Sequence, residues 1–184
     1  MTLIFGFGHR RYVGKDTCAN FAVSHVRANR RGIMVIKTGF SSKLKAVAYD
    51  LYSWAGLMDE EYYEQHPELK DVIIPAIGKS ARQIWIELGT SVGRAIYNDT
   101  WLVYVLKKKC DYLFLKDVRF PNEADAILDS GGYVFRIDNP RIEKYNDVAD
   151  SALASYDKWS GVIINDGDMT TLNKRVIETI HPLM

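Results

Sequence analysis

The sequence predicts an α/β fold in which helices cover both faces of a parallel sheet of about five strands. Two observations support this fold class. Short apolar runs alternate along the chain with segments of helical periodicity, and a glycine-rich stretch at 6–14 separates the first apolar run from the first helical segment. Such alternation implies helical crossovers between parallel strands, and therefore three layers, α/β/α. The 184 residues suit one domain spanning 1–184. Ligands in such folds bind at the carboxyl ends of the strands.

The apolar runs and the periodic segments define the expected elements. Short, mainly apolar runs predict strands at 3–7, 33–36, 112–115, 133–137 and 162–164. Apolar residues that recur every three or four positions predict helices at 16–27, 41–54, 80–96, 100–108, 121–129 and 170–180. Residues 59–69 are expected to form a short helix and a connection. The polar residues 139–149 are a candidate lid.

Two of these helices have an expected core face. The helix at 41–54 is expected to begin at Ser41 or Ser42 and to bury Leu44, Val47, Ala48 and Leu51. The helix at 80–96 is expected to bury Ile84, Leu88, Val92 and Ala95.

Charge and composition narrow the class of partner. The formal net charge is only +1, which argues against a nucleic acid polymer as the partner. Cys18 and Cys110 form no CxxC pair, and the four histidines have no metal-ligand spacing. No apolar run approaches the roughly 20 residues that cross a bilayer, so no membrane partner is expected. These features predict a protein of the reduced cytoplasm.

The segment GFGHRRYVGKDT, at 6–17, has the composition of a phosphate-binding loop. Glycines and a helix N-terminus can direct backbone N–H groups at a phosphate chain, and Lys15 supplies a cation. The match to GxxxxGK[ST] is imperfect, because His9 stands where the first glycine belongs and Asp16 stands where the Ser or Thr ligand of magnesium belongs. Thr17 follows one residue later. The alternative is a glycine-rich turn with a surface lysine, but the position between the first strand and the first helix favours phosphate binding.

A second motif, SARQIWIELGTSVGR at 80–94, lies on the longest predicted helix. At about 100° per residue, Arg82 and Gly89 share a face, and Gly93 lies near it. Small residues beneath an arginine leave room for a flat ligand whose phosphate the guanidinium binds. Arg94 points elsewhere. The alternative is a solvated face with glycines that serve helix packing.

The third motif, KDVRFPNE at 116–123, directly follows the predicted strand 112–115. A carboxylate at the end of a strand, here Asp117, can hold hydrated magnesium or a ligand hydroxyl. Arg119 is a candidate contact of the transferring phosphate. The alternative is a tight turn in which these two side chains merely pair.

Several other side chains carry weaker signals. Tyr62, Tyr63 and Trp101 are candidates for stacking on a base, but aromatic residues at helical spacing more often belong to the core. Taken by itself, Lys45 is expected to have a solvated side chain.

Taken together, the three motifs resemble the bacteriophage deoxynucleoside monophosphate kinases. The resemblance covers most of the chain and rests on GKDT at 14–17, R-x6-GT at 82–90 and DVRFPNEAD at 117–125. The turn NDG at 165–167 is similar as well. Metazoan phosphomevalonate kinases are similar in GKD and DVR and are the nearest alternative.

The resemblance implies a nucleoside-monophosphate-kinase-like fold, with ATP and Mg²⁺ as the donor and a deoxynucleoside monophosphate as the acceptor. It implies that the ATP phosphates lie on Gly14, Lys15, Asp16 and Thr17, and we expect Arg11 of the same loop to contact ATP as well. It implies an acceptor site that includes Leu44, Lys45, Arg82, Gly89, Thr90, Trp101, Asp117, Arg119 and Glu123. The loop 9–13 is longer than in the family, so its role stays open. A viral source would place the protein in the host cytoplasm.

The expected chemistry is positioning and charge neutralisation. Lys15, Arg82 and Arg119 are the expected catalytic residues, with Arg141 of the lid as a further candidate. Magnesium is expected at Thr17, with Asp16 or Asp117 as a second ligand. Two other classes stay open: a kinase for another small phosphorylated acceptor, and a nucleotide-binding switch without an acceptor. The oligomeric state also stays open, with a homodimer as one candidate.

Overall fold

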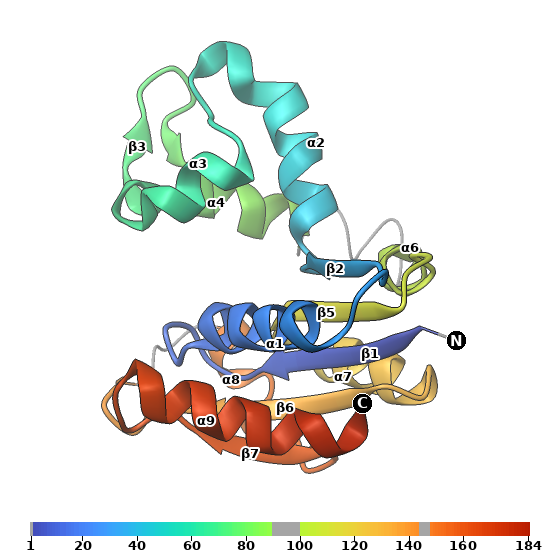
Figure 1. Cartoon of the computed structure of the whole chain (residues 1–184). Helices are drawn as coiled ribbons and strands as arrows, with labels where there is room; N and C mark the ends of the chain where they lie inside the picture. Colours follow the sequence, from blue (N-terminus) through green and yellow to red (C-terminus); the bar gives the residue numbers. More distant parts are fainter. Residues whose placement is uncertain (1, 90–99, 144–147) are drawn as a thin grey trace. The chain divides into compact units, whose positions relative to one another are not determined.

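The computed structural model describes residues 2–89, 100–143 and 148–184 (Figure 1). The chain forms two compact units. One comprises Met1–Phe40 and Tyr104–Met184, and the other comprises Ser41–Val103. We call them the sheet unit and the helical unit, and each is described by itself. The sequence-based prediction of one domain did not separate them, and it stays a prediction.

A five-stranded parallel sheet forms the centre of the sheet unit. The first strand, β1 (Leu3–Gly8), pairs with β5 (Tyr112–Val118) on one side and with β6 (Tyr133–Asp138) on the other. The outer strands are β2 (Val35–Thr38), which pairs with β5, and β7 (Gly161–Ile164), which pairs with β6. The strand order is therefore β2-β5-β1-β6-β7.

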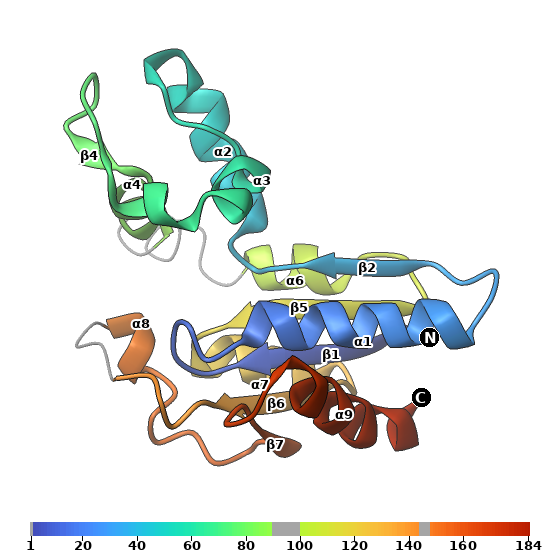
Figure 2. The same cartoon turned by 60° about the vertical axis from the view of Figure 1, so that its left-hand side comes forward.

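Helices cover both faces of this sheet, and successive residues of β1 are buried against them in alternation. Phe5 and Phe7 are fully buried in one cluster with α1 (Lys15–Asn29) and α9 (Met169–Ile180). The intervening Gly6 faces the other side, where a Cβ would lie 2.6 Å from Ile127 Cδ1 of α7 (Pro121–Asp129). Figures 1 and 2 show α1 and α9 on one face and α7 on the opposite face. The predicted three-layer α/β/α class is thus confirmed.

Three further short helices complete the part of the chain outside residues 41–99 that the structure describes. They are α6 (Thr100–Leu106), α8 (Val148–Ser151) and the 3-10 turn η4 (His181–Leu183). Among the residues described, no helix combines the length and the apolar character needed to cross a membrane.

The helical unit has a small core of its own. Its buried side chains are Ala48, Leu57, Tyr63, Ile74, Ala81 and Ile84. The contributing elements are α2 (Ser42–Tyr52), η1 (Ser53–Ala55), α3 (Glu60–Gln65), η2 (Pro67–Asp71), the antiparallel pair β3 (Ile73–Ile74) and β4 (Lys79–Ser80), and α4 (Ala81–Ile86).

Some predicted details of this unit are wrong. In α2 only Ala48 of the expected stripe is buried, whereas Val47 is 42% exposed and Leu51 is 52% exposed. The predicted start of this helix is confirmed, since Ser41 is the N-cap residue of α2, although its side chain makes no capping hydrogen bond. The α-helix that begins at Ala81 ends at Ile86, and residues 87–89 form a wider π-helical turn. Val92 and Ala95 of its predicted core lie outside the described residues.

Candidate phosphate-binding site

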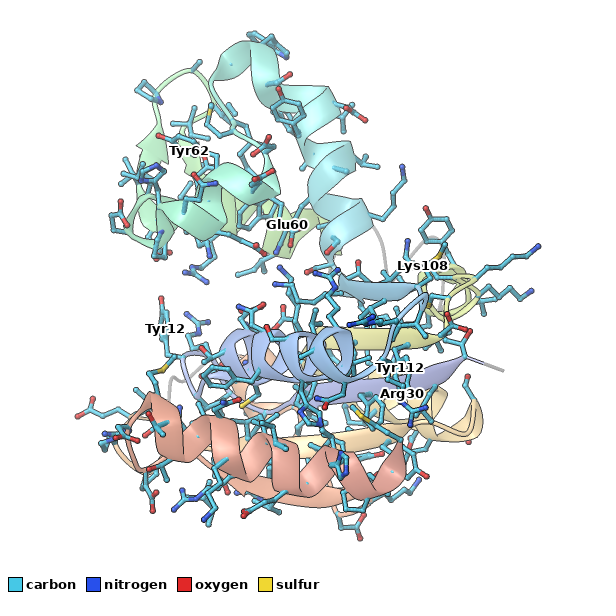
Figure 3. The ribbon with its side chains drawn as sticks, viewed as in Figure 1. Tyr12, Arg30, Glu60, Tyr62, Lys108 and Tyr112 are labelled. Atoms are coloured by element: carbon cyan, nitrogen blue, oxygen red, sulfur yellow. The ribbon has the colours of Figure 1, made fainter. Side chains whose placement is uncertain are left out.

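The loop between β1 and α1 has an unusual backbone conformation. The φ angles of His9, Tyr12 and Gly14 are 106°, 61° and 103°. Positive φ is uncommon for residues other than glycine, and it occurs preferentially where surrounding structure imposes it. Tyr12 is 54% exposed and projects from the loop (Figure 3).

The junction between the loop and α1 is fixed by a residue that follows β7, an edge strand of the sheet. Gly14 is the N-cap of α1, and a Cβ at this position would lie 2.6 Å from Asn165 Nδ2. The Asn165 amide donates a 2.9 Å hydrogen bond to the carbonyl oxygen of Val13. Asn165 follows β7, so the carboxyl end of that strand supports the loop. The NH groups of the first turn of α1 face the loop, which favours a bound anion.

Lys15 lies inside this loop and is only 4% exposed. Its Nζ donates a hydrogen bond to the carbonyl oxygen of Arg10 and lies 4.0 Å from Asp117 Oδ1. Burial, together with the positive charge of Arg119, lowers the pKa of Lys15 to about 8, although Asp117 acts in the opposite direction. The alternative interpretation, a glycine-rich turn with a surface lysine, is therefore wrong because Lys15 is buried.

Asp117 and Arg119 are held beside the loop by strand pairing. β5 extends three residues beyond the predicted end, so Asp117 belongs to the strand and Val118 pairs with Gly8. Asp117 Oδ1 accepts a 2.7 Å hydrogen bond from Arg119 Nε. Burial alone would lower the pKa of Arg119, but the carboxylates of Asp117, Asp150 and Glu123 raise it above its ordinary value. The guanidinium therefore stays charged.

Glu123 supports the turn that carries Arg119. The carboxylate is 5% exposed, and its Oε2 accepts hydrogen bonds from the backbone N–H groups of Arg119 (2.8 Å) and Phe120 (3.2 Å). These contacts cap the start of α7. The predicted contact of Glu123 with an acceptor stays a prediction.

Two candidate magnesium ligands lie on the first turn of α1. The Asp16 side chain is 67% exposed, with its Oδ1 3.9 Å from Lys116 Nζ, and Thr17 is half-buried. Within the described ranges, no group of three or more His, Cys, Asp or Glu side chains is placed to hold a metal. A magnesium ion that keeps several waters and binds phosphate oxygens needs only one or two protein ligands, so this pair fits such an ion.

Three residues of this site are not in the sequence-based set. His9 is 5% exposed, with Nδ1 3.0 Å from Asp138 Oδ1 and 3.2 Å from the Ile137 carbonyl oxygen. Burial and Arg136 lower the pKa of His9, although Asp138 opposes them. Asp150 and Asn165 both contact the loop. His9 lies in the loop motif and Asn165 in the NDG turn, whereas Asp150 gave no signal, because residues more than 120 positions apart share no local pattern.

Arg141 contacts the turn that follows β7. Its Nη2 donates to the carbonyl oxygens of Asn165 (3.3 Å) and Gly167 (3.2 Å). The guanidinium thus braces the turn that supports the loop. Part of the predicted lid, 144–147, lies outside the described residues.

The helical unit holds the other predicted site residues. Arg82 and Asp71 form a two-point ion pair, with 2.6 Å between Nε and Oδ1 and 3.2 Å between Nη2 and Oδ2. Lys45 is not solvated: its Nζ lies 2.9 Å from Glu60 Oε1 and 5.1 Å from the Trp85 ring centroid. Glu60 is labelled in Figure 3.

The expected ligand site beneath Arg82 stays a prediction. A Cβ at Gly89 would lie 3.4 Å from Leu44 Cδ1, so these two predicted residues are neighbours. The π-helical turn at 87–89 breaks the regular 100° spacing that placed Arg82 and Gly89 on one face. Tyr63 belongs to the core and packs edge-on against Trp85, with ring centroids 5.3 Å apart. Thr90, Gly93, Arg94 and the side chain of Trp101 lie outside the described residues.

The structure brings Arg11, Gly14, Lys15, Asp117 and Arg119 together in the sheet unit. Neither a protein-family model nor a curated protein matches this sequence. Among solved structures, the chain is similar to a dephospho-CoA kinase from Campylobacter jejuni, with a TM-score of 0.46 and 15% identity over 99% of this chain and 97% of that one. It is also similar to an unliganded sugar kinase from Janibacter sp. HTCC2649, with a TM-score of 0.43 and 13% identity over 98% of this chain and 95% of that one. The functional argument therefore rests on the site itself.

Proposed function

We propose that the protein is a P-loop kinase that transfers the terminal phosphoryl group of ATP to a deoxynucleoside monophosphate. The products are ADP and the deoxynucleoside diphosphate. One observation carries the proposal. The buried amine of Lys15 lies at the N-terminus of α1, inside a loop that follows the central strand of a parallel sheet.

A purely structural role for this lysine is a poor explanation. Burial and the nearby Arg119 both disfavour its charged form, as the lowered pKa records. Asp117, whose Oδ1 lies 4.0 Å from Lys15 Nζ, offsets this effect only in part, because the pKa of Lys15 remains lowered. A phosphate chain on the loop would supply further negative charge, and strongly perturbed groups in such places are typical of functional sites.

The residues around Lys15 fit phosphoryl transfer. We infer that Lys15 and the loop N–H groups hold the β- and γ-phosphates of ATP, while Arg119 neutralises charge that develops on the transferring group. Thr17, with Asp16 or Asp117, would hold magnesium, which supplies further charge neutralisation at the phosphates. A general base is not needed, because a phosphate monoester is largely ionised at neutral pH.

The choice of acceptor rests on the motifs. DVRFPNEAD at 117–125 and R-x6-GT at 82–90 resemble the bacteriophage kinases, and this favours a deoxynucleoside monophosphate. We assign the acceptor phosphate to Arg82, which would exchange its ion pair with Asp71 for the ligand. Leu44, Lys45 and Gly89 are the proposed neighbours of the acceptor.

A coupled assay of ADP release tests the proposal across all deoxy- and ribonucleoside monophosphates, with phosphomevalonate as a further acceptor. We expect turnover with at least one deoxynucleoside monophosphate. Turnover with phosphomevalonate alone would reassign the acceptor, and ATP hydrolysis that no acceptor stimulates would indicate a nucleotide switch. No turnover by the folded protein would refute the kinase assignment.

A further inference from the structure

Asp150 is a buried carboxylate at the same end of the sheet as the phosphate loop. It lies in the short helix α8, and its side chain is 0% exposed. Figure 2 shows α8 at the end of the sheet where β1 enters the loop. The chain after α8 is anchored by Leu153, which is 1% exposed.

One hydrogen bond and two ion pairs of the site meet at one oxygen of Asp150. Its Oδ1 accepts a 2.9 Å hydrogen bond from the backbone N–H of Arg11 and lies 3.5 Å from Arg11 Nε. The same oxygen lies 3.6 Å from Nη1 of Arg119. A loop N–H combined with two guanidinium groups is the set of donors that binds a phosphate oxygen.

A phosphate group on this loop would need the same donors. The Arg11 N–H lies between Gly8 and Gly14, where a P-loop directs its N–H groups at phosphate. A carboxylate and a phosphate side by side repel each other, so both cannot share these donors without a large penalty. One of these two anions therefore has to leave the shared donors.

We propose that the Asp150 carboxylate occupies the place of a phosphate oxygen in the ligand-free protein, and that a nucleotide polyphosphate displaces it from Arg11 and Arg119. This inference rests on the proposed phosphate-binding function of the loop. It makes Asp150 a built-in competitor of the ligand. It also couples phosphate binding to a movement of α8.

The first test measures binding of inorganic tripolyphosphate by calorimetry, without magnesium, for the wild type and Asp150→Asn. Asparagine keeps the size of the side chain and an oxygen that accepts from the Arg11 N–H, but it removes the charge. We expect the variant to bind about tenfold more tightly, the size of effect associated with one charge-assisted hydrogen bond. Thermal unfolding of both proteins checks that they are folded.

Asp166→Asn is the matched control, because it removes one negative charge from the turn after β7 that supports the loop. The Oδ1 of Asp166 lies 2.5 Å from Arg175 Nη1, and Asp166 is not among the residues proposed to bind phosphate. We expect a much smaller gain in affinity from this variant. An equal gain in affinity would mean that the effect of Asp150→Asn comes only from the change in net charge, and it would overturn the proposal.

Hydrogen exchange measures the displacement itself. We expect backbone amides of Val148–Ser151 to exchange faster when tripolyphosphate is bound to the wild type. Slower or unchanged exchange would mean that Asp150 remains in place, and it would overturn the proposal.

The outcomes separate this inference from the function on which it rests. If the wild type binds tripolyphosphate and Asp150→Asn binds it equally or more weakly, the competition by Asp150 is refuted and the phosphate site is retained. If only Asp150→Asn binds tripolyphosphate, Asp150 prevents binding in the wild type, which supports the proposal. If neither folded protein binds, both the phosphate site and the competitor are refuted.

Discussion

At the scale of single residues, the site places three positive side chains around two carboxylates. Lys15 and Arg119 both lie close to Asp117, and Arg119 also approaches Asp150 together with Arg11. This arrangement raises the pKa of Arg119 and leaves Lys15 with a pKa of about 8. The protonation of one amine therefore falls within an accessible pH range.

The lowered pKa predicts how ATP binding depends on pH. Below pH 8 Lys15 is protonated and attracts the phosphates, and above pH 8 the free protein loses this charge. The last ionisation of a terminal phosphate lies at about pH 6, so it does not contribute in this range. We expect the Kd for ATP, measured by calorimetry, to rise progressively between pH 8 and pH 10.

Lys15→Arg is the control, because a guanidinium does not titrate in this range. The affinity of this variant should not show the rise between pH 8 and pH 10, whatever its absolute value. A flat profile for the wild type would contradict the role of the Lys15 charge in phosphate binding.

Asp16 provides a second prediction at this scale. If it binds magnesium through water, Asp16→Asn should raise the magnesium concentration that gives half-maximal activity. If its charge only stabilises the first turn of α1, which follows the N-cap Gly14, Asp16→Asn should lower the stability of the helix and leave the midpoint unchanged. Magnesium titrations at saturating ATP decide between the two, and an unchanged midpoint would leave Thr17 as the ligand.

Residue types near the loop were predictable, as was the pairing of Asp117 with Arg119, but the long-range partners were not. Lys15, Asp117 and Arg119 stand in motifs whose spacing carries information. Asp150 contacts Arg11 from 139 positions away, and that contact depends on how α8 meets the sheet. A local sequence pattern cannot indicate a contact between residues so far apart in the chain.

At the scale of elements, strand and helix types were predicted well and their ends less well. β5 continues to Val118 because it is paired with β1 up to Gly8, and pairing is not visible in an apolar run. β2 begins two residues later than predicted, at Val35. The periodicity of 80–96 did not reveal the π-helical turn at 87–89, since such a turn changes the backbone hydrogen-bond pattern, which the spacing of apolar residues does not show.

The junction between the loop and α1 gives a prediction at this scale. Gly14→Ala combines a positive φ of 103° with a Cβ 2.6 Å from Asn165 Nδ2. Gly32→Ala is the control, because its φ is also positive, at 70°, but nothing lies within 4 Å of the added Cβ. Positive φ alone costs about 1–2 kcal/mol for alanine.

Urea unfolding and ATP calorimetry distinguish these two variants. We expect Gly32→Ala to lose about 1–2 kcal/mol of unfolding free energy and to keep its ATP affinity. Gly14→Ala should lose more stability and should also bind ATP more weakly, because the loop shifts. Equal effects on both measurements would show that the close approach of Asn165 does not shape the loop.

At the scale of the whole molecule, the alternation of elements predicted a parallel sheet but not its strand order. The order β2-β5-β1-β6-β7 places the first strand at the centre. That position brings the loop after β1 next to the ends of β5 and β6, which supply Asp117 and Asp138. The helical unit was not separated in the prediction, because its amphipathic segments have the same periodicity as crossover helices.

The most direct test of the central claim is the fate of a label on the γ-phosphate of ATP. With magnesium and the panel of deoxynucleoside monophosphates, we expect the label to appear in a deoxynucleoside diphosphate. Lys15→Met should reduce this transfer by at least about 100-fold while remaining folded, because it removes a charge that stabilises the transition state. A folded wild-type protein that transfers no label to any acceptor, or releases it only as inorganic phosphate, would contradict the assignment as a deoxynucleoside monophosphate kinase.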